Sequence, residues 1–269
     1  MPGWQLSALL KELRGNLLHD KSDQVSGASD YLWDDDTLVR YINEAQRRFA
    51  RQSLVIHDGT TDAVTLITSA ENTDFYPLHS SIIAVLSVKM DPTASASILD
   101  HTALPRAGFD AFNNYHTPDP LFFDPNQIEQ MTPGKPVAFG TDDYVNSDAN
   151  GSFGVMSFRF FPTPSAQYSG VPYRLRVVRE PINDLTTSNL AAYPEIPAAN
   201  HLDILDYAAY LALRNVDTDI AGANAPARAD QFEARFDKSC AKAKALVMRK
   251  LFAPLQWGFG HNGWSWESL

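Results

Sequence analysis

Apolar residues near the start of the chain recur at the spacing of an α-helix. The first stripe is formed by Leu6, Leu9, Leu10, Leu13 and Leu17. After a polar linker over residues 19–30, Asp34-Asp35-Asp36 stand where a helix N-cap and an acidic first turn are favoured. A second stripe follows, formed by Leu38, Ile42, Ala45 and Phe49. The pattern predicts two amphipathic helices, over about 4–18 and 35–56.

From Gly59 the pattern changes to the alternation that is typical of half-buried strands. Residues 61–68 alternate and are rich in Thr, Val and Ile, and residues 82–90 form a second candidate strand. Shorter strands are predicted at 137–139 and 153–161, the latter after the tight-turn signal Asn150-Gly151. Residues 173–179 alternate apolar side chains with arginines, which predicts a strand with one wet, basic face. We expect five or six strands, mostly antiparallel.

Helical spacing returns in the last third of the chain. Pro194-Glu195-Ile196-Pro197 indicates a helix start. The apolar stripe behind it is formed by Leu202, Leu205, Ala209, Ala212 and Val216. A turn over 217–226 then leads to a fourth helix over about 227–251.

The order of elements predicts an α+β fold. We expect a four-helix bundle formed by both chain ends, an inserted and mostly antiparallel β domain, and an extended C-terminal arm. The corresponding segments are 1–58 and 194–252 for the two helical pairs, 59–193 for the β domain with long acidic loops, and 253–269 for the arm.

The charge of the chain is uneven. Its 269 residues include 22 Lys and Arg against 32 Asp and Glu, and residues 61–200 hold 15 acidic side chains against 7 basic ones. A conventional nucleic-acid-binding domain has the opposite sign. Two interpretations stay open, an acidic surface that aids solubility and a surface that repels a polyanion. The candidate residues of this acidic surface are Asp110, Asp119, Asp124, Glu129, Asp142, Asp143 and Asp148.

The search for catalytic or metal-binding motifs gives none that is convincing. The single cysteine, Cys240, excludes an intrachain disulfide, and the seven histidines are scattered without metal-ligand spacing. The glycines of residues 258–263 match a dinucleotide fingerprint literally, but no helix can follow them within the last residues. We expect a soluble chain that is not an enzyme, with no catalytic residues, no metal, no cofactor and no membrane contact.

The last residues of the chain have an unusual composition. The 253–269 arm has one charged residue, Glu267, and four large aromatic residues, Trp257, Phe259, Trp264 and Trp266. Such side chains either fold back onto the core of the chain or anchor the arm in another subunit, because Trp and Phe are strong interface anchors. We favour an arm that anchors in another subunit.

Several motifs, in order along residues 6–250, resemble the head–tail connector (adaptor) proteins of tailed bacteriophages, especially short-tailed ones. The residues that carry the resemblance are Trp33-Asp34-Asp35-Asp36, followed by Leu38 and by Tyr41-Ile42-Asn43-Glu44-Ala45-Gln46-Arg47. Further similar features are residues 75–78, 134–136, 160–164, 179–181 and 194–197.

This resemblance implies a structural protein of the virion neck, assembled in the host cytoplasm. It implies a ring, usually of twelve copies, that docks on the portal protein and receives the tail tube or nozzle, while viral DNA passes through the centre without specific binding. It also implies a monomer in isolation, with ring closure driven by the portal. Two alternatives stay open: a phage-associated peptidoglycan or carbohydrate hydrolase, and a receptor-binding tail accessory protein.

Overall fold

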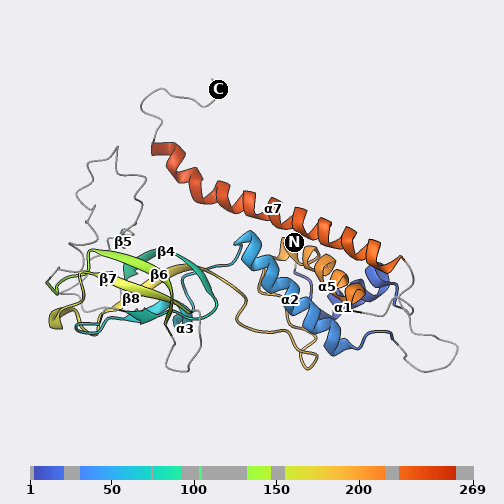
Figure 1. Ribbon diagram of the computed structural model, residues 1–269, viewed down its shortest axis with the longest axis horizontal. Helices are drawn as coiled ribbons and strands as arrows, with labels where there is room; N and C mark the ends of the chain where they lie inside the picture. Colours follow the sequence, from blue (N-terminus) through green and yellow to red (C-terminus); the bar gives the residue numbers. More distant parts are fainter. Residues whose placement is uncertain are drawn as a thin grey trace, which may run out of the picture. The chain divides into compact units, whose positions relative to one another are not determined.

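The chain forms two compact units. The computed structural model describes residues 3–20, 31–73, 75–91, 103–104, 132–146, 155–215 and 224–258. Unit 1 combines Met1–Ile56 with Glu180–Leu269, and unit 2 is His57–Arg179. Figure 1 shows helices in the first unit and mainly strands in the second. The predicted α+β class is therefore confirmed, whereas the four-segment division of the chain stays a prediction.

Unit 1 is helical. Its elements are α1 (Leu6–Glu12), the π-helical turn η1 (Leu13–Leu18), α2 (Asp35–Ser53), the 3₁₀ turn η3 (Ala198–Asn200), α5 (Asp203–Arg214) and α7 (Ala225–Gly258). Helices α2, α5 and α7 meet at a cluster of aromatic rings. The ring of Phe236 lies 5.9 Å from that of Phe49 and 4.9 Å from that of Tyr207, between centroids. Helices from the two ends of the chain therefore share one hydrophobic core.

Helix α2 begins where its sequence predicts and ends at Ser53, earlier than the predicted end near residue 56. The Asp34 carboxylate accepts a hydrogen bond from the backbone N–H of Thr37, which satisfies one of the free donors of the first turn. The C-cap residue is Leu54, whose φ of 58° lies in the left-handed region. The predicted stripe of Leu38, Ile42, Ala45 and Phe49 is 0 % exposed.

Helix α5 begins later than predicted. The 194–197 motif is not helical: Pro197 has an extended backbone with ψ of 138°, and the helix starts at Asp203. Leu202, which we placed in the buried stripe, is instead 44 % exposed, because it precedes the helix rather than lying on its inner face. Val216 and most of the predicted turn over 217–226 lie outside the described residues.

Unit 2 contains two antiparallel sheets. The larger contains β1 (His57–Asp58), β2 (Leu66–Thr68), β4 (Ile82–Met90), β5 (Ala103–Leu104) and β8 (Pro172–Arg179). In it β8 pairs with β1, β2 and β4, and β4 also pairs with β5. The smaller has the order β3 (Tyr76–Pro77), β7 (Val155–Phe161) and β6 (Ala138–Asn146). The strand predicted over 82–90 has the observed bounds of β4.

The strand predicted over 61–68 is only partly correct. Residues Asp62–Thr65 form the one-turn helix α3, and only Leu66–Thr68 form a strand. The carbonyl oxygen of Thr61 accepts hydrogen bonds from both the N–H and the hydroxyl of Thr65, each 2.9 Å long. These local bonds stabilise a helical turn where alternation of side chains alone indicated a strand.

Aromatic side chains join the two sheets of unit 2. Phe158 and Phe160 lie two residues apart in β7, and their side chains are 0 % and 2 % exposed. The ring of Phe160 lies 4.5 Å from that of Tyr173 in β8, and the ring of Phe139 in β6 stacks on that of Phe158 at 5.7 Å. Unit 2 thus has a core of its own.

Candidate functional site

The sequence singled out an aromatic arm and an acidic surface. Trp257 is part of helix α7, whereas Phe259, Trp264 and Trp266 lie outside the described residues. Asp142 and Asp143 lie in strand β6, with Asp142 opposite Ser157, whereas the other acidic candidates, Asp110, Asp119, Asp124, Glu129 and Asp148, also lie outside them. The roles assigned to both groups stay predictions.

Trp33 and Asn43, from the motifs that carry the resemblance, are explained by packing within unit 1. The indole N–H of Trp33 donates to the carbonyl oxygen of Ala212 over 3.3 Å. The side chain of Asn43 makes hydrogen bonds to both backbone groups of Leu185. These motif residues therefore connect the N-terminal helices to segments more than 140 residues further along the chain.

A second connection fixes the N-terminal segment. His201 is 3 % exposed, accepts a hydrogen bond from the Trp4 N–H at Nδ1 over 2.9 Å, and contacts the Ile196 carbonyl oxygen through Nε2 over 3.0 Å. The backbone N–H groups of Leu6 and Ser7 donate to carbonyl oxygens of the segment before the 194–197 motif. The start of α1 is thus held by the chain that precedes α5.

Arg14 organises an exposed corner at the start of α2, residues 31–36, which we call the 31–36 corner. The Arg14 side chain is 10 % exposed and forms ion pairs with Asp20 and, over 2.7 Å, with Asp35. Its guanidinium group lies 4.1 Å from the ring centroid of Tyr31, a cation–π contact, and Asp20 accepts the Leu32 N–H over 2.9 Å.

These contacts present apolar and acidic groups side by side on the 31–36 corner. Tyr31 and Leu32 remain 44 % and 41 % exposed. The three aspartates that follow Trp33 are exposed as well. A surface that is held in place, partly apolar and negatively charged is suited to binding another protein.

The arginines near the end of α2 are engaged within unit 1. Arg47 binds Asp184 and Arg51 binds Glu180, each over 2.6 Å. Arg48 donates to the Tyr207 hydroxyl over 2.6 Å. These three arginines therefore stabilise the packing of α2 against the rest of unit 1. Their position in the sequence is explained by these contacts, without a polyanionic ligand.

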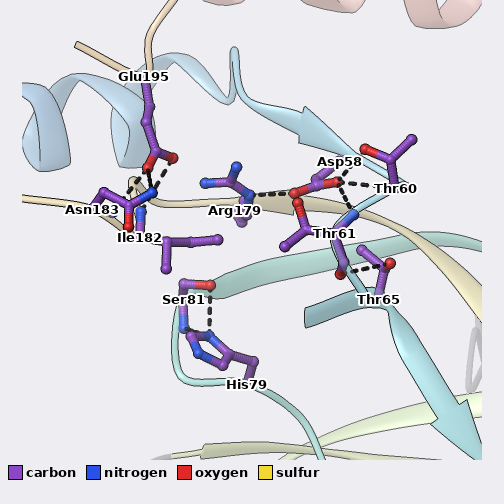
Figure 2. Close-up of polar contacts among 10 residues, drawn as sticks. All are labelled: Asp58, Thr60, Thr61, Thr65, His79, Ser81, Arg179, Ile182, Asn183 and Glu195. Atoms are coloured by element: carbon purple, nitrogen blue, oxygen red, sulfur yellow. Dashed lines mark hydrogen bonds and ion pairs between the residues drawn. The ribbon is translucent and has the colours of Figure 1, made fainter. Parts of the chain in front are cut away.

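In unit 2, an ion pair joins the first and last strands of the inserted segment. Asp58 accepts backbone N–H groups of Thr60 and Thr61 over 2.9 and 3.1 Å, and accepts Arg179 Nε over 2.7 Å (Figure 2). Burial raises the pKa of Asp58, but these hydrogen bonds outweigh burial and hold the pKa well below its usual range. Since His57 also pairs with Val178, the chain enters and leaves unit 2 on adjacent strands.

In unit 1, Glu195 shapes the chain that returns from unit 2. Its carboxylate accepts the N–H groups of Ile182 and Asn183, over 3.2 and 2.8 Å, and the side-chain amide of Asn183 over 2.8 Å (Figure 2). The glutamate of the 194–197 motif thus orders a turn and does not begin a helix.

Helix α7 extends beyond the hydrophobic core of unit 1. Ala243 is the last α7 residue of that core within the described side chains, and the helix continues to Gly258. Leu246 is 49 % exposed, and Val247 and Met248 are half-buried.

The described residues give little support for a metal site, a membrane-spanning helix or a reactive thiol. In the part of the chain that the structure describes, no group of three or more His, Cys, Asp and Glu side chains is placed to hold a metal ion, and no helix is long and apolar enough to span a membrane. Burial raises the pKa of the Cys240 thiol to about 12, so this thiol is protonated at neutral pH.

The fold and its ordered surfaces define an interaction protein, in which both chain ends build a helical unit and the intervening segment builds a β unit. The chain belongs to the SU10 adaptor protein family, whose family model matches residues 5–256. Membership implies the role of a phage head–tail adaptor, a structural and generally non-enzymatic virion component that binds other virion components. It confirms the resemblance found in the sequence motifs. A search of curated proteins finds no match to this chain.

Proposed function

We propose that this protein forms a ring, of twelve copies, that docks on the portal, receives the tail tube or nozzle and forms part of the channel for DNA ejection. The observation that supports this most is the family match, which spans residues 5–256 and so includes both helical ends and the inserted strands. In this proposal the helices of both chain ends act as one four-helix bundle, a rigid body that can repeat around a ring.

The 253–269 arm is the proposed anchor in the portal or a neighbouring subunit. Its aromatic residues Trp257, Phe259, Trp264 and Trp266 supply apolar anchors, and only Glu267 is charged.

The acidic residues of the 91–148 region are the proposed lining of the channel, where their charge would keep DNA from adhering during ejection. The proposal rests on the nine acidic side chains between Met90 and Phe158, against two basic ones, Arg106 and Lys135. A ring structure with these residues on the outer wall would contradict this part of the proposal.

The decisive experiment is native mass spectrometry of the purified chain, alone and with its cognate portal. We expect a monomer alone and twelve copies added to the portal. Deleting residues 253–269, or changing Trp264 and Trp266 to Ala, should reduce occupancy. A matched control changes the polar Asn262 and Ser265 of the same arm to Ala and should leave occupancy unchanged. Absence of portal binding by the intact chain would contradict the adaptor proposal and would direct attention to peptidoglycan and glycan substrates.

A further inference from the structure

The second half of α7 differs in charge from the rest of the molecule. Residues 238–258, which we call the distal α7 segment, contain five basic side chains and no acidic one: Lys238, Lys242, Lys244, Arg249 and Lys250. The rest of the chain holds the other 17 of its 22 basic side chains against all 32 acidic ones. A strongly acidic protein thus presents one locally basic helix, and the surface that complements it is acidic.

This segment also has an exposed apolar side chain, Leu246, that the helical core of unit 1 does not cover. Beyond Ala243 the helix continues for 15 residues to Gly258, about 22 Å at the usual rise per residue. Lys242, Lys244, Arg249 and Lys250 are exposed around a half-exposed Leu246. An extension of this length has marginal stability by itself in water, so packing against a partner would stabilise it.

The 31–36 corner has the complementary chemistry. It presents the exposed side chains of Tyr31 and Leu32 beside the three exposed aspartates that begin α2. Arg14 and Asp20 hold the corner in place through their contacts to Tyr31, Leu32 and Asp35. An ordered surface binds a partner with little loss of side-chain entropy.

The two surfaces lie at opposite ends of unit 1. Arg228, near the start of α7, donates to the carbonyl oxygen of Leu17 over 2.8 Å, and Arg14 of the same N-terminal helix binds Asp35. The start of α7 therefore lies at the end of unit 1 that bears the corner. The segment after Ala243 extends away from that end, as Figure 1 shows for α7 and the start of α2.

We propose that the distal α7 segment of one copy docks on the 31–36 corner of a second copy of this chain. Since the segment after Ala243 leads away from the corner of its own copy, one copy does not satisfy both surfaces by itself. The two surfaces differ, so the contact is heterologous and every copy offers one of each. Repetition of such a contact builds a ring where the rotation between copies closes, which is the case that the proposed function requires. This inference deepens the proposed function and rests on it, because it names the surfaces by which neighbouring copies of the ring would meet.

Disulfide trapping between two different single variants tests the contact in the full-length chain. One preparation contains Leu32→Cys and the other Leu246→Cys, and they are mixed with portal under a glutathione redox buffer. The native Cys240 is buried, and its raised pKa keeps it protonated, so it does not compete. The matched control replaces Leu32→Cys by Leu190→Cys, since Leu190 and Leu32 have similar exposure, 43 % and 41 %.

We expect the Leu32→Cys and Leu246→Cys pair to form the mixed disulfide at least about 10-fold faster than the control pair, with the rate falling as salt is raised from about 50 to about 500 mM. Equal rates for the two pairs would overturn the proposal. A dominant disulfide between two Leu246→Cys copies would also overturn it, because it would indicate α7 pairing symmetrically with α7.

A second measurement separates this proposal from the adaptor proposal. Adding Lys242→Glu and Lys244→Glu to the Leu246→Cys copy should replace attraction to the acidic 31–36 corner by repulsion and abolish trapping. Adding Lys11→Glu instead, which is also a Lys-to-Glu change at an exposed position of unit 1, should leave trapping unchanged. If the Leu246→Cys copy that retains Lys242 and Lys244 is trapped on the portal instead of on the second copy, the docking proposal fails while the adaptor function stands. If the intact chain binds no portal, the adaptor proposal fails.

Discussion

The side-chain amide of Asn43 makes two hydrogen bonds to the backbone of Leu185, one as donor and one as acceptor. Asn43 Nδ2 donates to the Leu185 carbonyl oxygen over 2.8 Å, and Asn43 Oδ1 accepts the Leu185 N–H over 2.9 Å. Both residues are buried, at 8 % and 5 % exposed, and Gln46 donates to the same Oδ1 over 3.0 Å. An asparagine on the inner face of α2 thus satisfies the backbone of the segment that returns from unit 2.

Replacing Asn43 by Leu should destabilise unit 1. The change leaves the N–H and carbonyl group of Leu185 buried without these partners, so the free energy of unfolding should fall by about 3 kcal/mol. Urea unfolding followed by circular dichroism measures the loss. The control is Glu44→Gln at the neighbouring exposed position, which should change stability by less than about 0.5 kcal/mol. Equal stability of the two variants would show that the Asn43–Leu185 pairing contributes little.

Asp58→Asn should weaken unit 2 mainly at neutral pH. Because the pKa of Asp58 in the folded protein lies below its ordinary value, its carboxylate stabilises the fold above about pH 4, and that contribution is lost as the pH falls below it. The variant should therefore be less stable than the wild type by about 2 kcal/mol at pH 7, with a smaller difference near pH 3.

Urea midpoints at several pH values check this expectation. Asp62→Asn serves as the control, since the Asp62 side chain is 69 % exposed where it pairs with Arg174. A difference between wild type and Asp58→Asn that does not change with pH would contradict the role assigned to the ionised carboxylate.

Asp206→Asn should have the opposite pH dependence. Burial, with a smaller contribution from nearby Asp203, raises the pKa of Asp206 to about 6 against the attraction of Arg235 at 2.9 Å. The folded state therefore holds this proton more tightly than the unfolded chain, so the contribution of Asp206 to stability is greatest below about pH 4 and is lost as the pH rises through about 6.

The Asp206→Asn variant does not undergo that loss and should be more stable than the wild type at pH 7, by about 1–3 kcal/mol before the lost Arg235 pair is considered. Thermal unfolding at pH 4, 5, 6 and 7 provides the profile. The exposed Asp230→Asn on α7 is the control and should follow the wild-type profile. A fall in stability of Asp206→Asn between pH 4 and 7 as steep as that of the wild type would refute the assignment.

Unit 1 should fold without unit 2. Since His57 and Val178 are paired on adjacent antiparallel strands, with Cα atoms about 5 Å apart, the chain ends left by excising 57–179, Ile56 and Glu180, directly follow this pairing and a short Gly-Ser linker can join them. We expect helical circular dichroism and one cooperative unfolding transition. Extending the excision through Leu185 removes the partner of Asn43 and should abolish that cooperativity. A non-cooperative transition in the first variant would show that unit 1 depends on the insert.

The sequence was most informative where one pattern determines burial. The stripe of α2 and the bounds of β4 agree with the structure, because helical and alternating periods report which side of an element faces the core. It was wrong where local hydrogen bonds compete with that pattern: Thr61 and Thr65 form a helical turn within the predicted strand, and the 194–197 motif is a non-helical segment that precedes α5.

The sequence by itself therefore determined the α+β class, the apolar faces of its main elements and membership of an adaptor family whose motifs follow one order along the chain. Only the tertiary structure decided which distant groups meet: Asn43 with Leu185, Trp33 with Ala212, and Arg14 with both Tyr31 and Asp35. The physical reason is that burial follows from periods of a few residues, whereas each buried polar group is satisfied by a partner that only the folded path of the chain brings near.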